Sequence, residues 1–180
     1  MVVNMNTKTI SIVLLILVLA ACTPIRETKP LEPLNIGLVL PLTGAGSSLG
    51  NMYLEGAQLA VDDLNNAHVL DRPIRLVVED TASEPKNAVT AMQKLASADG
   101  VKFFATIASS HGLALKSVAM ENNVLLFGDV SHPNMTGDSP LLFRHSNIAE
   151  DEAEILANKS IELGGRRVVS FTLMMTMATP

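Results

Sequence analysis

Between residues 35 and 170, short apolar runs alternate with segments whose apolar residues recur at helical spacing. Such runs suit strands that are buried on both faces, as in a parallel sheet. Strands and helices that alternate through short links predict parallel pairing through right-handed crossovers. We therefore expect an α/β fold, a doubly wound parallel sheet with helices on both of its faces.

The pattern also predicts where each element lies. Strands are expected at residues 35–40, 74–78, 102–107, 124–127 and 167–170, and helices at about 53–64, 83–95, 112–122 and 149–163. Ser83 is expected to cap the second helix, and Pro85 to lie in its first turn. The inward-facing positions are expected to be Tyr53, Ala57, Ala60, Val61 and Leu64, then Ala88, Met92 and Leu95, and then Leu115, Val118 and Ala119. The last helix has an apolar stripe of Ala153, Leu156 and Ile161, which is expected to stay exposed or to dock on the rest of the domain, because the sheet that it would cover is almost absent.

In a doubly wound sheet, ligands bind beyond the carboxyl ends of the strands. This rule selects four loops, at residues 41–50, 79–84, 108–112 and 128–137. These loops contain many glycines and small polar residues. We therefore expect a binding site along this edge of the sheet.

The N-terminus has the features of an export signal. Lys8 precedes an apolar run at residues 12–21, which is too short to span a bilayer and suits a signal peptide that is removed. The run ends in Leu19-Ala20-Ala21-Cys22, which resembles the lipobox of bacterial lipoproteins. The resemblance implies cleavage before Cys22 and a lipid on its sulfur. An ordinary signal peptide followed by a chance cysteine is the alternative, and Met5 is an alternative start.

Composition excludes several function classes. Cys22 is the only cysteine, so the exported part has no internal disulfide and no cysteine-based metal site. The net charge of −5 argues against nucleic acid as a partner. The acyl chains on Cys22, rather than a basic patch, would hold the protein at the membrane. The prolines of residues 22–34 favour an extended tether between the lipid and the domain.

Several stretches together resemble a known family. They are Ile-Gly-Leu-Val-Leu-Pro-Leu-Thr-Gly at 36–44, Gly50, Gly-Ala-Gln-Leu-Ala-Val-Asp-Asp-Leu-Asn at 56–65, Glu79-Asp80 with Pro85 and Ala88-Val89, Ala108-Ser109-Ser110, and Ser-His-Pro-Asn-Met-Thr at 131–136. Their order and spacing over residues 35–169 resemble the type I periplasmic binding proteins, the branched-chain amino acid-binding (leucine-binding) family of ABC transporters. The resemblance implies two lobes of this α/β type that close on a ligand.

The expected role follows from this resemblance and from the lipobox. The chain would be an extracytoplasmic solute-binding lipoprotein that delivers an amino acid or a similar small polar molecule to an ABC permease. It would face the periplasm from the outer membrane of a Gram-negative cell, or lie on the outer face of a Gram-positive plasma membrane. A lipoprotein that senses a ligand or activates an envelope enzyme, without transport, is the alternative.

The resemblance also assigns candidate ligand-binding residues. Ser109, with its neighbour Ser110, matches the serine that holds the ligand carboxylate, and a helix start offers free N–H groups there. Val130 and Ser131 match positions whose backbone and hydroxyl groups meet the ammonium and carboxylate of the ligand. The alternatives are a plain helix N-cap for Ser109 and a turn for the other pair.

The remaining candidates have less support. Asp129 departs from the small neutral residue common in the family, and we expect it to cap a turn rather than pair with a ligand cation. Ser48 and Leu49 are expected to touch the ligand side chain. The sequence has no nucleophile elbow, no phosphate-binding loop and no glycine motif for a dinucleotide, and its histidines lack the spacing of metal ligands. We therefore expect neither an enzyme nor a cofactor.

The C-terminus departs from the family pattern. Residues 35–147 correspond to the N-terminal lobe and 148–170 to the start of the second, whereas Met-Met-Thr-Met-Ala at 174–178 replaces a motif like Asn-Asp-Asp-Tyr-Gly. Codons that encode Met-Met-Thr-Met-Ala can encode Asn-Asp-Asp-Tyr-Gly when they are read in the frame that begins one base earlier. We hypothesise a truncating frameshift between Val168 and Phe171, with an out-of-frame tail at 171–180. It would be a pseudogene, a programmed shift or a sequencing error; a genuine short C-terminus is the alternative.

Overall fold

The structure is a computed structural model that describes residues 31–165. The predicted signal peptide, the lipid site at Cys22, most of the tether, the strand at 167–170 and the tail at 171–180 lie outside these residues. Among the helices described, none is long and apolar enough to cross a membrane. The domain expected at 35–147 and the helix that follows it are described.

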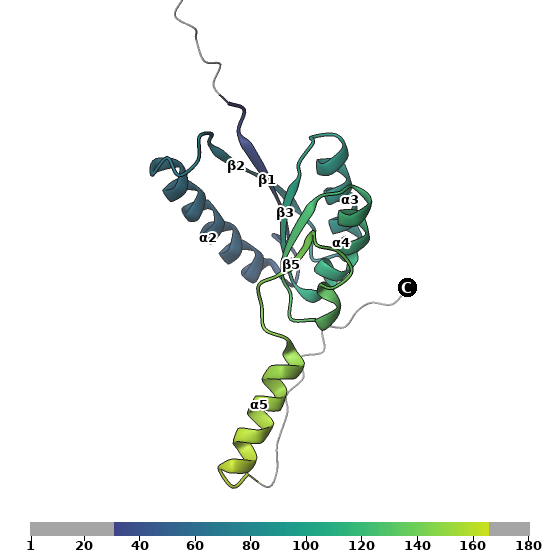
Figure 1. Cartoon of the computed structure of the whole chain (residues 1–180). Helices are drawn as coiled ribbons and strands as arrows, with labels where there is room; N and C mark the ends of the chain where they lie inside the picture. The colour runs from purple at the N-terminus through teal and green to yellow at the C-terminus, as the bar shows by residue number, and fades with distance from the viewer. Residues whose placement is uncertain (1–30, 166–180) are drawn as a thin grey trace, which may run out of the picture. The chain divides into compact units, whose positions relative to one another are not determined.

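Five parallel strands form one sheet, in the order β2-β1-β3-β4-β5 (Figure 1). Their bounds are β1 (Leu34–Leu40), β2 (Ile74–Asp80), β3 (Phe103–Ile107), β4 (Leu125–Asp129) and β5 (Leu142–Arg144). The doubly wound α/β fold is therefore confirmed. The sequence analysis missed β5, because three residues are too few to show a periodic pattern.

Helices lie on both faces of the sheet (Figure 1). The helices of the described residues are α2 (Ser47–Asn66), α3 (Pro85–Ser97), α4 (Ser109–Glu121), the short 3-10 helix η1 (Pro133–Met135) and α5 (Ala149–Glu162). α2 covers one face, and α3 and α4 cover the other. Both α2 and α4 begin earlier than predicted, so Ser48 and Leu49 lie in the first turn of a helix rather than in a loop.

The larger part of the core lies between the sheet and helices α3 and α4. All the inward positions predicted for these two helices are buried there, packed against β1, β3 and β4 residues such as Phe104 and Leu126. On the other face, Leu38, Leu40 and Ile107 pack against Tyr53, Leu54 and Ala57 of α2. Ala60 and Leu64 are exposed, contrary to the prediction, because α2 packs mainly on β1 and β2 and buries a narrower stripe.

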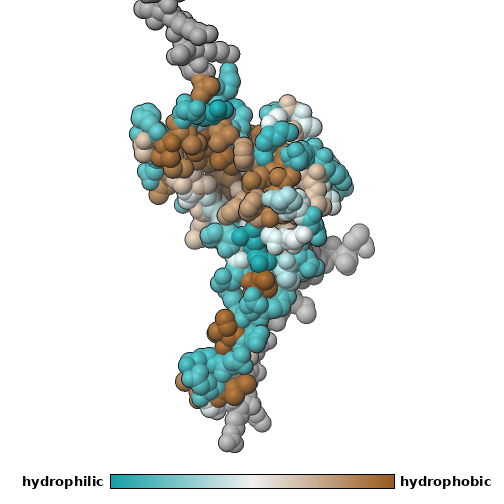
Figure 2. Space-filling view, in the orientation of Figure 1, coloured by the Kyte–Doolittle hydropathy of each residue, from teal (hydrophilic) through white to brown (hydrophobic). Residues whose placement is uncertain are grey.

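The apolar stripe of α5 is exposed, which is one of the two outcomes expected for it. Ile155, Leu156 and Ile161 are 67%, 67% and 68% exposed, and the helix has no buried residue. Figure 2 shows brown hydrophobic patches on the surface of this helix, in the lower part of the view. Within this part of the chain, α5 therefore contributes nothing to the core.

Gly50 in the first half of α2 sets how closely this helix approaches β1. A Cβ atom at Gly50 would lie 2.1 Å from the carbonyl oxygen of Pro41, a backbone atom that cannot move aside cheaply. At Gly56, in the same helix, nothing lies within 4 Å of a Cβ position. The two glycines therefore make a matched pair for testing this packing.

We expect Gly50→Ala to destabilise the chain by about 1–3 kcal/mol, because the helix must move away from the Pro41 turn. Gly56→Ala should instead stabilise it by roughly 0.5–1 kcal/mol, since alanine suits a helix interior better than glycine. Urea unfolding of both variants measures this difference. Equal stability of the two variants would contradict the packing described.

Candidate functional site

The carboxyl ends of β1, β2, β3 and β4 bring the four expected loops together at one edge of the sheet. The carboxylate of Asp80, the last residue of β2, organises the first two loops. Its Oδ1 accepts hydrogen bonds from the N–H groups of Leu42 (2.9 Å), Thr43 (3.1 Å) and Ala82 (2.8 Å), and its Oδ2 accepts one from the Thr43 hydroxyl (2.6 Å). The hydrogen bond from Thr43, followed by those from the backbone, lowers the pKa of Asp80 in spite of an opposing desolvation effect.

Ser83 joins the same two loops, and it does not cap α3 as predicted. Glu84 is the N-cap of α3, without a side-chain capping bond, and Pro85 follows as expected. The Ser83 hydroxyl accepts from the N–H of Gly46 (2.9 Å) and donates to the carbonyl of Thr43 (2.8 Å). The hydroxyl is drawn away from α3 because these unpaired groups of the neighbouring loop lie within its reach.

The first turn of α4 faces this edge with free polar groups. Ala108 is its N-cap, with φ at 70°, a conformation that is strained for a residue with a Cβ atom. Ser109 is the first residue of the helix, so the plain N-cap alternative for it is wrong. The N–H groups of the first turn have no partner in the helix, and the Ser109 hydroxyl makes no hydrogen bond within residues 31–165. This turn can therefore receive an anion.

His111, in the same turn, is a site residue that the sequence analysis did not select. Its side chain is 3% exposed, and its Nε2 lies 2.9 Å from the hydroxyl of Thr81 in the loop after β2. Its Nδ1 lies 3.4 Å from the Ser110 hydroxyl. Burial lowers the pKa of His111, and the charge of Glu84 opposes this. No local pattern could have revealed the Thr81 contact, because the two residues are 30 positions apart.

The end of β4 carries the other predicted residues. The Val130 side chain is buried in the core, so only its backbone is available to a ligand. Ser131 is partly exposed, and its carbonyl accepts from the N–H of Ala149 (3.1 Å). Asp129 makes no turn-capping hydrogen bond among the described residues, which corrects our expectation; its Oδ1 lies 3.9 Å from Nδ1 of His145.

Two glycines let the α4 and β4 ends approach each other. A Cβ atom added at Gly112 would lie 2.5 Å from Cγ2 of Val130, and one added at Gly128 would lie 2.8 Å from Cε of Met135. Lys116 of α4 pairs with Asp138 and donates to the carbonyl of Asn134. The loop after β4 is therefore fixed against α4, which brings Ser131 to the same edge as Ser109.

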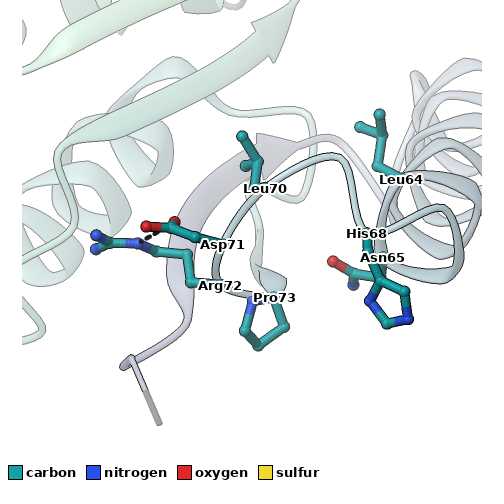
Figure 3. A pocket seen from close by; sticks show the side chains of 7 residues that line it. All are labelled: Leu64, Asn65, His68, Leu70, Asp71, Arg72 and Pro73. Atoms are coloured by element: carbon teal, nitrogen blue, oxygen red, sulfur yellow. Dashed lines mark hydrogen bonds and ion pairs between the residues drawn. The ribbon is translucent and has the colours of Figure 1, made fainter. Parts of the chain in front are cut away.

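One hollow lies away from this edge, and another reaches it on the α2 side of the sheet. The first, of about 240 Å³, is bounded by the loop between α2 and β2, where Asp71 pairs with Arg72 on the opposite side from His68 (Figure 3). The second, of about 210 Å³, lies beside α2 on the sheet face, and Asp129 and His145 reach its rim. In the described part of the chain no group of acidic, histidine or cysteine side chains is arranged to hold a metal ion.

We expect the carboxylate of Asp80 to make stability depend on pH. The pKa of Asp80 is lower in the folded chain than in the unfolded chain, where it is about 3.9. The contribution of Asp80 to the free energy of unfolding is therefore complete above the unfolded pKa and is lost as the pH falls through the folded pKa. The loss in unfolding free energy caused by Asp80→Asn should therefore be largest at neutral pH and shrink in acid. Asp63→Asn, at an exposed carboxylate of α2, is the control. A loss that stays constant down to about pH 2 would contradict this role.

Comparison with known proteins agrees with this geometry. A family model described as "Periplasmic binding protein" matches residues 33–174. Leu/Ile/Val-binding protein BraC3 of Rhizobium johnstonii is 36% identical over 95 residues, which are 52% of this chain and 26% of that protein. Leu/Ile/Val-binding protein homolog 3 of Brucella melitensis is 30% identical over 130 residues, 69% of this chain and 35% of that protein.

Solved structures of binding proteins are also similar to this chain. Leucine binding protein LivK from Thermotoga maritima superposes with a TM-score of 0.67 at 29% identity, over 73% of this chain and 38% of that one. A second structure is LivJ from Streptococcus pneumoniae, a branched-chain amino acid transporter substrate binding protein in complex with isoleucine. It superposes with a TM-score of 0.60 at 26% identity, over 64% of this chain and 34% of that one. The chain thus spans between 26% and 38% of the length of these relatives. It belongs to the periplasmic binding protein family.

Proposed function

We propose that the protein is the extracytoplasmic solute-binding component of an ABC importer, and that this chain supplies the N-terminal lobe of its binding site. The observation that carries the proposal is the first turn of α4, where unpaired N–H groups and the free Ser109 hydroxyl face the carboxyl edge of the sheet. The names of the relatives, which refer to leucine, isoleucine and valine, support an amino acid or a similar small polar molecule as the ligand.

In this proposal each candidate residue has a distinct role. Ser109 and Ser110 donate hydrogen bonds to the ligand carboxylate at the positive end of the α4 dipole. Val130, through its backbone, and Ser131, through its hydroxyl, meet the ammonium and the carboxylate. Asp129 lies at the same strand end, where its carboxylate adds negative charge near the ammonium.

Ser48 and Leu49 are proposed to contact the ligand side chain. Both lie in the first turn of α2, and the Leu49 side chain is 49% exposed. The same turn is held to the edge of the sheet through Asn51, whose amide donates to the carbonyl of Leu42 (3.1 Å). An apolar side chain of the ligand could therefore rest on Leu49 without displacing a core residue.

We further propose that Cys22 carries a lipid and that residues 22–34 tether the lobe to the membrane. The motif at residues 19–22 supports this part of the proposal. A permease and an ATPase are the partners that an importer requires. The relatives are named as binding proteins, so a role without catalysis is consistent with them, and their names give no support to the sensing alternative.

Loss of the hydroxyl at Ser109 should weaken ligand binding. We expect Ser109→Ala to cost about 1–3 kcal/mol of binding free energy, because a buried carboxylate is left short of a donor. The measurement is calorimetry with leucine on a chimera in which residues 32–147 replace the matching lobe of a Leu/Ile/Val-binding relative. Ser117→Ala, at an exposed hydroxyl of the same helix, is the matched control and should bind normally. If both variants bind equally well, Ser109 has no role in binding.

The 180-residue chain by itself should bind leucine only weakly. A site enclosed by two lobes excludes water and so strengthens each polar contact, whereas a single edge leaves the ligand in bulk solvent. Calorimetry on the chain should detect no heat of binding at micromolar leucine. A micromolar dissociation constant would show that this lobe binds without a second one.

A further inference from the structure

Three polar side chains form a connected path from the interior to the candidate site. Thr81, in the loop after β2, is fully buried, and its hydroxyl oxygen lies 2.9 Å from Nε2 of His111. Nδ1 of His111 lies 3.4 Å from the hydroxyl oxygen of Ser110, a long hydrogen bond. Ser110 is partly exposed in the first turn of α4. The path therefore ends where an anionic ligand group is proposed to bind.

The burial of Thr81 determines the direction of these hydrogen bonds. Its hydroxyl has a single partner within residues 31–165, which is His111. If Nε2 carried the imidazole proton, it would donate to Thr81 and leave the Thr81 hydroxyl proton buried without an acceptor, which is costly. If Nε2 is unprotonated, Thr81 donates to it and every proton has an acceptor. The second arrangement requires the imidazole proton to lie on Nδ1.

The charge state of the ring agrees with this arrangement. Burial lowers the pKa of His111, so the ring is neutral at neutral pH and has one donor and one acceptor nitrogen. The N-terminal end of the α4 dipole also disfavours a cation in this turn. Glu84 is the charged group that acts in the opposite direction.

The tautomer has a consequence for Ser110. With the proton on Nδ1, His111 donates to the Ser110 oxygen, and the Ser110 hydroxyl proton is free to point out of the turn. With the proton on Nε2, the Ser110 hydroxyl would instead donate inward to Nδ1. Only the first arrangement leaves Ser110 as a donor to a bound anion.

We propose that His111 is a positioning residue, held in its Nδ1-protonated tautomer by Thr81, which makes the Ser110 hydroxyl a hydrogen-bond donor to the carboxylate of the ligand. The direction of the path rests on the contacts of Thr81 alone, whereas the ligand rests on the proposed function. The two parts are therefore tested by separate measurements.

Nitrogen NMR of the full 180-residue chain labelled with ¹⁵N-histidine tests the tautomer. We expect the Nδ1-protonated form for His111 at neutral pH. Thr81→Val, which removes the hydroxyl at nearly constant shape, should shift His111 toward the Nε2-protonated form, and Thr81→Ser should restore the original signal. His68, exposed beyond the C-terminal end of α2, should keep its signal in both variants. An Nε2-protonated His111 in the unmodified chain would overturn the proposal, even if Thr81→Val fails to fold.

Leucine at millimolar concentration, followed through the amide signals of the first turn of α4, tests the ligand. Ser110→Ala and Thr81→Val should each weaken this binding by about tenfold, the effect of one lost hydrogen bond to a charged group. Thr90→Val, at an exposed hydroxyl of α3, is the matched control and should bind as the unmodified chain does. Unchanged binding in Ser110→Ala would overturn the role of Ser110. An unmodified chain whose signals leucine leaves unchanged would overturn the proposed function, independently of the tautomer.

Discussion

β1 pairs in parallel with β2 on one side and with β3 on the other, and this pairing places the binding edge. Parallel strands end on the same side of a sheet, so the loops after β1, β2 and β3 meet although they are far apart in the sequence. Asp80 then converts this proximity into a fixed geometry. Its carboxylate accepts from backbone N–H groups of the loops after β1 and β2, and without it the N–H groups of Thr43 and Ala82 would need water.

Close packing on the α3 and α4 side keeps the first turn of α4 at this edge. The ring of Phe104 packs against Gly37, where an added Cβ atom would lie 2.6 Å from the ring, and Val130 packs in the same way against Gly112. The strained backbone of Ala108 lets the helix begin directly after β3. Strain of this kind persists only where the surrounding structure holds it, and here the larger part of the core surrounds it.

The two faces of the sheet are unequally covered. α2 packs on β1 and β2, whereas Phe103, Phe127 and Phe143 point to the same side of the sheet and are 41%, 43% and 44% exposed. Phe127 pairs with Phe143 in the strand register, so these rings form one apolar surface beside the hollow near α2. The binding edge depends on the covered face, because Thr81, His111 and Val130 all pack on that side.

Local residue patterns determined the order of strands and helices, the parallel sheet and the loops that form the edge, because periodicity and short links leave few topologies. The resemblance to a family of binding proteins, rather than these patterns, assigned Ser109 and Ser131 as candidates. Contacts between distant segments could not be derived in this way: the hydroxyl of Ser83 turning to the loop after β1, the contact of Asp129 with His145, and the burial of His111 against Thr81. Tertiary structure alone decided these, because a polar side chain bonds whichever partner the fold brings within reach, and sequence spacing does not encode that distance.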